Sequence, residues 1–264
     1  MEANKFDVII IGGSYSGLAA GMALGRAFRK VLIIDGGEPC NAQTPHSHNF
    51  LSQDGQSPHQ TADLCKRNPR YASFFPGMAE SWGISILHCP FCHGYEVHNM
   101  KTGIIGNGTH GFELALLISN WTMDLTFFTN GNSTLSREQV SKPDDHHIKS
   151  VEGTIEKLEH RAGYLKQVVL DDGSTLPITA AYIRSPFQQA CPIPESPGCN
   201  LTADGYLQVD DQQNTTISGG FACGDNITKT RTLAKAVASG TTTGKAASNN
   251  SSHNSFNRKT KAHL

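Results

Sequence analysis

Two cysteines, Cys89 and Cys92, stand three positions apart in the segment HCPFCHGYE, and His88 and His93 flank them. This C-x-x-C spacing lets two thiols close a small disulfide ring, and a helix beginning at the motif would stabilise a thiolate through its N-terminal dipole. Imidazole titrates near neutral pH, so either histidine could carry protons to and from the sulfur atoms. The motif therefore predicts redox chemistry of a dithiol, with Cys89, Cys92, His93 and His88 as candidate catalytic residues.

Zinc is an alternative for these four residues, because cysteine and histidine are its usual ligands. A structural zinc site generally draws on a second ligand pair at a characteristic spacing. The sequence offers no such pair, although His98 is a further candidate ligand. We therefore favour a redox dithiol, expect no metal, and keep a zinc-stabilised module as an alternative.

The bulk composition narrows the classes of partner. The net charge is −1 and 17% of the residues are charged, so neither nucleic acid nor a membrane surface is an expected partner. No segment has the apolar length needed to cross a bilayer, and we expect a cytoplasmic protein. Seven widely spread cysteines do not resemble a secreted disulfide framework. Outside the motif we interpret them as packing or surface residues: Cys40, Cys65, Cys191, Cys199 and Cys223.

A repeat organises the elements that must position the dithiol. Residues 7–17, DVIIIGGSYSG, predict a buried strand and a glycine-rich turn; a helix pattern follows, then a strand ending at Asp35. The layout returns 94 residues later, with a strand over 102–105, another glycine turn, and a strand ending at Thr129. Two such turns in register are far more specific than one, and they predict two Rossmann-like nucleotide-binding units.

The glycine turns are candidate phosphate sites. Glycine permits the tight turn and lets the backbone approach a pyrophosphate at the positive end of the helix. The acid that ends the following strand is placed to accept hydrogen bonds from a ribose. In the second unit Thr129 replaces this acid and no arginine cluster follows, so a nicotinamide ligand is less well supported there. The candidates are Gly12, Gly13, Ser14, Gly17 and Asp35 in the first unit, and Gly106, Gly108 and Gly111 in the second.

The segment TISGGFACGDN, residues 216–226, predicts an apolar strand that ends at Gly224 and Asp225. Parallel sheets bind ligands at the carboxyl edge of their strands, so Asp225 is a further candidate ligand-binding residue. It could equally be the N-cap of the helix pattern that follows. Between the second glycine turn and this segment, Asp171-Asp172-Gly173 predicts a hairpin turn.

Three ordered motifs, IIIGGSYSGLAA, HCPFCHGYE and GGFACGDN, make the chain resemble the low-molecular-weight thioredoxin reductases and their dithiol-oxidase-like relatives, the second branch more closely. The resemblance implies an α/β fold with a discontinuous FAD domain, an inserted NAD(P)-type domain, and a homodimer. We place the FAD domain at residues 1–97 plus 205–250 and the inserted domain at 98–204. The polar segment 251–264 predicts a disordered tail.

The resemblance also implies roles for single residues. Cys92 would face the flavin, while Cys89 would exchange with a thioredoxin-like protein or a small dithiol. His93 stands where the reductases carry an acid. The residues that would hold FAD are the glycines, Ser14 and Asp35 of the first turn together with Asn49 for the adenine-side half, Asp225 for the ribityl chain, and Arg231 and Thr232 for the isoalloxazine.

Two departures from the family pattern matter. The second unit lacks the basic cluster with which these reductases recognise NADPH, which favours oxygen or another electron acceptor, or weak use of NADH. The interval before the redox motif is short, so we expect a strand of the FAD sheet to be missing. The leading hypothesis is an FAD-dependent thiol–disulfide oxidoreductase, and the alternative is a non-catalytic nucleotide-binding relative that no longer binds FAD efficiently.

Overall fold

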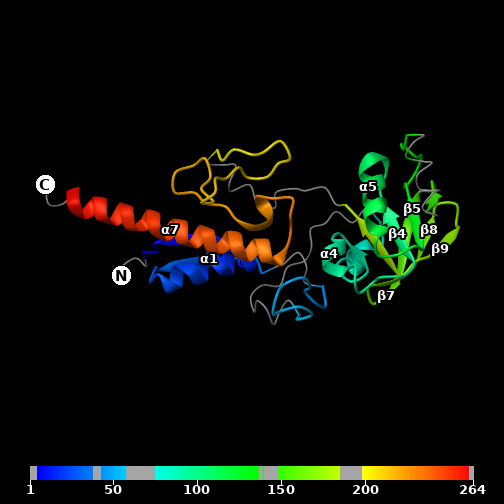
Figure 1. Cartoon of the computed structure of the whole chain (residues 1–264), viewed down its shortest axis with the longest axis horizontal. Coiled ribbons are helices and arrows are strands. Elements are labelled where there is room, and N and C mark those ends of the chain that lie inside the picture. Colours follow the sequence, from blue (N-terminus) through cyan, green and yellow to red (C-terminus); the bar gives the residue numbers. More distant parts are fainter. Residues whose placement is uncertain are drawn as a thin grey trace.

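The computed structural model describes residues 5–37, 43–57, 75–136, 139, 148–184 and 198–261, with side chains described as far as residue 252. Helices α1 and α7 lie side by side at one end of the molecule, and a parallel sheet with α4 and α5 forms the other end (Figure 1). The fold is α/β, as predicted.

The first unit joins both ends of the chain. Strands β1 (Val8–Ile11) and β2 (Val31–Ile34) pair in parallel, and helix α1 (Tyr15–Arg26) connects them in the sequence. Helix α7 (Leu233–Lys261) packs along α1. A Cβ atom at Gly240 would lie 2.1 Å from the backbone oxygen of Ser16, so only glycine allows the two helices to approach this closely. The short 3-10 helix η1 (Gly224–Asn226) lies beside the start of α1.

The second unit contains a five-stranded parallel sheet in the order β3-β10-β4-β5-β6. Helix α5 (Gly108–Ile118) follows β4 directly, so the strand, glycine turn and helix of the predicted repeat are present in both units. The bounds are β3 Ile86–Leu87, β4 Thr102–Ile105, β5 Leu125–Phe128, β6 Lys149–Val151 and β10 Ala180–Ile183.

A second sheet packs against the first. It is antiparallel and consists of β7 (Ile155–Arg161), β8 (Tyr164–Leu170) and β9 (Thr175–Pro177). The turn between β8 and β9 holds Gly173 at φ +81°, which confirms the predicted hairpin.

The segment just before residue 98, which we placed in the FAD domain, packs with the second unit. Met78 of helix α3 (Met78–Ser81), Trp82 and Ile86 are buried in one core with side chains of β7 and β8. Strand β3 pairs with β10 of the parallel sheet. Residues 75–97, redox motif included, therefore pack with the second unit.

Two other segments differ from the sequence analysis. Residues 216–223 form no strand, because tight hydrogen bonds from Gly220 to Ile217 and from Thr215 to Gly220 fold them into a turn; one isolated bridge, between Asn214 and Phe221, remains. Helix α7 continues to Lys261, past residue 251, where we expected a disordered tail to begin. None of the helices in the described ranges is long and apolar enough to cross a membrane.

The sheet of the first unit is narrow. Among the described residues, β1 pairs only with β2. Ile9, Ile11 and Ile34 are 58%, 56% and 50% exposed, so the face of this sheet that carries them has no layer packed on it in the described part of the chain. This arrangement agrees with the short interval in the sequence, which led us to expect a missing strand.

The close approach at Gly17 provides a stability test. A Cβ atom there would lie 1.9 Å from the backbone oxygen of Gly12, so we expect Gly17→Ala to lower the free energy of unfolding by about 1–3 kcal/mol. Gly25 is the matched control, because it lies in the same helix with nothing within 4 Å of its Cβ position. Gly25→Ala should raise stability by about 0.5–1 kcal/mol. Denaturant unfolding measures both, and equal effects of the two substitutions would contradict the predicted contact.

Candidate active site

The redox motif occupies the step from a strand into a short helix. Cys89 follows β3 and is the N-cap residue of α4 (Pro90–His93). Pro90 suits the first helical position, where its missing N–H group would have had no intrahelical partner. This turn brings the two sulfur atoms, Cys89 Sγ and Cys92 Sγ, to 2.7 Å, with both thiols free and half-buried. The proximity expected from the C-x-x-C spacing is thus present.

The two thiols differ in acidity. The Cys92 thiol donates a hydrogen bond to Cys89 Sγ, and the backbone N–H groups of Cys92 and Phe91 also stabilise a negative charge there. Together these groups lower the pKa of Cys89 to about 7, although burial opposes them. The same thiol hydrogen bond, burial and the charges of Cys89 and Glu96 raise the pKa of Cys92. Cys89 is therefore the thiol that ionises first.

His88 and His93 have different surroundings. The ring of His88 stacks on Trp82 at a centroid distance of 5.9 Å and an interplanar angle of 6°. Although part of His88 is exposed, the protein packed around it disfavours the charged imidazolium and, with His93 and Arg231, lowers its pKa to about 4. Burial and the nearby His48 lower the pKa of His93, and Glu96 opposes this shift.

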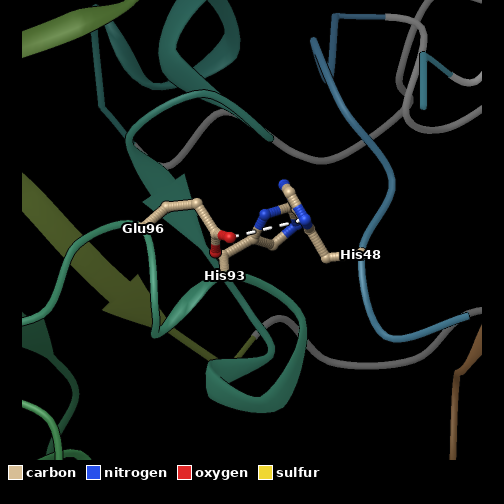
Figure 2. Close-up of side chains that lie close together, drawn as sticks. All are labelled: His48, His93 and Glu96. Atoms are coloured by element: carbon tan, nitrogen blue, oxygen red, sulfur yellow. Dashed lines mark ion pairs between the residues drawn. The ribbon is translucent and has the colours of Figure 1, made fainter. Parts of the chain in front are cut away.

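Two residues that the sequence analysis missed lie beside His93 (Figure 2). His48 comes from the distant segment 43–57, and its Nδ1 lies 3.4 Å from Glu96 Oε1 and 3.6 Å from Asp54 Oδ2. Its ring is nearly perpendicular to that of His93, with centroids 5.9 Å apart. Glu96 follows His93 by three positions, a spacing that could have signalled it, whereas no local pattern could have linked His48 to the motif.

The first glycine turn has the geometry of a dinucleotide site. Gly12 adopts φ +102°, and the N–H group of Gly13 donates to Asp35 Oδ1 at 2.6 Å. Ser14 is the N-cap residue of α1 and makes no side-chain capping hydrogen bond. With Gly17 leaving room for the turn, the start of α1 can approach a phosphate group closely. These residues fit the adenine-side half of FAD.

Asp225 lies at the same end of α1. A Cβ atom at Gly224 would come within 2.5 Å of Ser16 Oγ, so the turn that carries Asp225 packs on the first turn of the helix. Although part of Asp225 is exposed, the protein packed around its carboxylate raises the pKa of Asp225, and the positive charge of Arg231 opposes this shift. Because the charge of Arg231 acts on both Asp225 and His88, this arginine is near both the first unit and the redox motif.

The two remaining flavin candidates have local roles in the structure. Thr232 Oγ1 accepts a hydrogen bond from the Lys235 N–H at the start of α7. Asn49 adopts φ +60°, and its N–H group donates to Asp54. These contacts do not bring Asn49 into the first glycine turn.

The second glycine turn is held by its own side chains. Asn107 Oδ1 accepts hydrogen bonds from the Gly108 N–H group and from both the N–H and hydroxyl groups of Thr134. The amide nitrogen of Asn107 donates to the backbone oxygens of Thr129 and Asn132. Thr129, in the acid position, is buried, and its hydroxyl group donates to Gly131. The start of α5 is thus tied to the loop after β5 at the place where a nucleotide would approach.

The fold and this site define a protein with two nucleotide-binding units and a dithiol beside the boundary between them. A family model described as pyridine nucleotide-disulphide oxidoreductase matches residues 66–240, more than half of the chain, and the chain belongs to this family. It is therefore an FAD-dependent oxidoreductase of the thioredoxin-reductase-like group.

Relatives and solved structures agree with this assignment. The thioredoxin reductase tcpT of Claviceps purpurea is 26% identical over 308 residues, covering 93% of this chain and 94% of that protein. The thioredoxin reductase aclD of Aspergillus oryzae is 26% identical, with 85% and 90% covered. The crystal structure of an oxidoreductase from Agrobacterium tumefaciens gives a TM-score of 0.81 at 29% identity, with 92% and 97% covered. The crystal structure of HlmI gives a TM-score of 0.90 at 23% identity, with 99% of this chain and 97% of that chain covered, and it shares the fold.

The acidity of Cys89 can be measured by alkylation of the reduced protein. Because only the thiolate reacts, we expect the rate of iodoacetamide labelling at Cys89 to reach half its maximum near pH 7. Cys92→Ala removes the thiol that donates the largest stabilising hydrogen bond and should move this midpoint upward, toward the ordinary thiol value. Mass spectrometry locates the label. Preferential labelling of Cys92 in the wild type, or a midpoint that Cys92→Ala leaves in place, would contradict the assignment.

Proposed function

We propose that the protein oxidises dithiols, with Cys89 and Cys92 cycling between disulfide and dithiol against FAD. The observation that carries this proposal is the contact between the two sulfur atoms, with the more acidic thiol at Cys89. The substrate is a thioredoxin-like protein or a small dithiol. Relatives named thioredoxin reductases support this substrate class.

The proposed exchange starts from the Cys89–Cys92 disulfide. A substrate thiolate attacks Cys89 Sγ, the bond to Cys92 breaks, and a mixed disulfide forms at Cys89. The second substrate thiol then attacks the substrate sulfur of this mixed disulfide, which releases substrate disulfide and the Cys89 thiolate. A thiol of low pKa leaves readily, so the acidity of Cys89 favours this second step. His93, adjacent to Cys92 in α4, is the proposed group that accepts the proton lost by the attacking substrate thiol.

FAD supplies the two-electron oxidation that returns the dithiol to the disulfide. We propose that Gly12, Gly13, Ser14, Gly17 and Asp35 hold its adenine-side half. Asn49 belongs to the same proposed group, although its described contacts are to Asp54 alone. Asp225 would bind the ribityl chain, and Arg231 and Thr232 would lie near the ring. The position of Arg231, whose charge reaches both Asp225 and His88, supports a ring binding between the first unit and the motif.

Oxygen or another small acceptor is the proposed destination of the electrons. Gly106, Gly108 and Gly111 form a nucleotide turn, but the N–H group of Gly108 is already bonded to Asn107. A nicotinamide dinucleotide would have to displace the hydrogen bonds that Asn107 makes with the loop after β5. Direct reduction of the flavin by NAD(P)H is therefore expected to be slow.

The redox cycle is tested by anaerobic mixing of the FAD-loaded protein with excess dithiothreitol. We expect rapid loss of the visible flavin absorbance in the wild type, and in Cys92→Ser a rate no faster than that of free FAD. Cys199→Ser is the matched control, since Cys199 is another half-buried free thiol, outside the motif. A colourless protein that does not take up FAD would instead support the non-catalytic alternative.

The electron acceptor is tested in the same apparatus with NADPH or NADH in place of the dithiol. The tied loop at Asn107 predicts bleaching at least about tenfold slower than with dithiothreitol, which corresponds to a barrier about 1.4 kcal/mol higher. Readmission of oxygen to the dithiol-reduced protein should restore the absorbance. Bleaching by NADPH that outpaces the dithiol would contradict the proposed direction and indicate a reductase.

A further inference from the structure

We propose that His48, His93 and Glu96 form a binding site for a divalent cation of the zinc class, beside the redox pair. One donor atom of each residue lies within 4.8 Å of the other two. Figure 2 shows the two imidazoles and the carboxylate turned toward one another from two separate segments. This set differs from the four-residue zinc alternative of the sequence analysis, because it contains neither cysteine and takes its first ligand from a distant part of the chain.

The donor chemistry matches zinc. Two histidines and a glutamate are a ligand set that zinc takes where its fourth position stays open to water or another ligand. Bonds of about 2.0–2.2 Å in tetrahedral geometry put neighbouring donors roughly 3.3–3.5 Å apart. His48 Nδ1 and Glu96 Oε1, at 3.4 Å, already have this separation. The remaining donor-atom distances, none above 4.8 Å, would have to shorten by at most about 1.5 Å, which side-chain rotation can supply.

Burial and nearby charge also favour a cation. The side chain of His48 is only 15% exposed, while that of Glu96 is 39% exposed and leaves a path from solvent. Asp54 Oδ2, 3.6 Å from His48 Nδ1, adds a second negative charge beside the site.

A cation bound here would have two consequences for the chain. It would fasten segment 43–57, which carries His48, to the redox loop that carries His93. It would also occupy a ring nitrogen of His93 and so withdraw this residue from proton transfer, a consequence that rests on the proposed function. Zinc would then slow dithiol turnover while leaving the fold intact.

The binding claim can be tested without any redox turnover. In the FAD-loaded full chain carrying Cys89→Ser and Cys92→Ser, the redox thiols no longer compete for zinc. We expect this protein to bind one equivalent of Zn²⁺ in competition with a chromophoric chelator. Adding His48→Gln should weaken the affinity at least about tenfold, because removal of a ligand should exceed the 10–100-fold losses seen for residues that only support ligands.

His46→Gln in the same background is the matched control. His46 belongs to the same segment, with its ring 6.3 Å from that of His48, but it bonds to the Gly55 backbone oxygen and is not one of the three ligands. It should leave the zinc affinity unchanged. Absence of zinc binding, or an affinity equal in His48→Gln and His46→Gln, would overturn the site and would indicate that His48 only pairs with Glu96 and Asp54. Unchanged flavin content and circular dichroism would show that the variants remain folded.

Discussion

The contact between two sulfur atoms at the start of helix α4 is the interaction on which the rest of this account depends. Cys89 is the N-cap residue, so its sulfur accepts hydrogen bonds from the backbone N–H groups of Phe91 and Cys92 and from the Cys92 thiol. These donors favour a negative charge on one sulfur and disfavour it on the other. A helix of only four residues thereby makes two chemically identical side chains unequal, with one suited to exchange with substrate and the other held protonated.

Close approaches at three glycines set the arrangement of the first unit around the start of α1. Gly17 lies against the backbone of Gly12, Gly240 against the backbone of Ser16, and Gly224 against the Ser16 side chain, so these contacts hold the first glycine turn, α7 and the turn that carries Asp225 together. The segment that leads into the motif packs with the second unit through Met78, Trp82 and Ile86. The second unit thus positions the dithiol near the first unit. The charge of Arg231 acts on Asp225 of the first unit and on His88 beside the motif.

Local patterns predicted the fold well, and they predicted the motif. The apolar strands, glycine turns and C-x-x-C helix each depend on residues close in sequence, so the repeat and the sulfur contact could be anticipated. Contacts between distant segments could not. His48 meets Glu96 across 48 positions, and the core around Met78 joins residues before position 98 to the second unit. Residues 216–223 have a strand-like composition, yet glycines 219 and 220 turn the chain there.

An anaerobic reductive titration of the FAD-loaded protein tests the central claim, electron transfer between Cys92 and the flavin, most directly. Dithionite reduces the flavin, and a disulfide in contact with it then takes up electrons from the flavin as well. The account predicts that each wild-type chain accepts two electrons on the flavin and two more on the disulfide, with new thiols at positions 89 and 92, and that Cys92→Ser accepts only the first two. Equal uptake by both proteins, with the disulfide left intact, would contradict it.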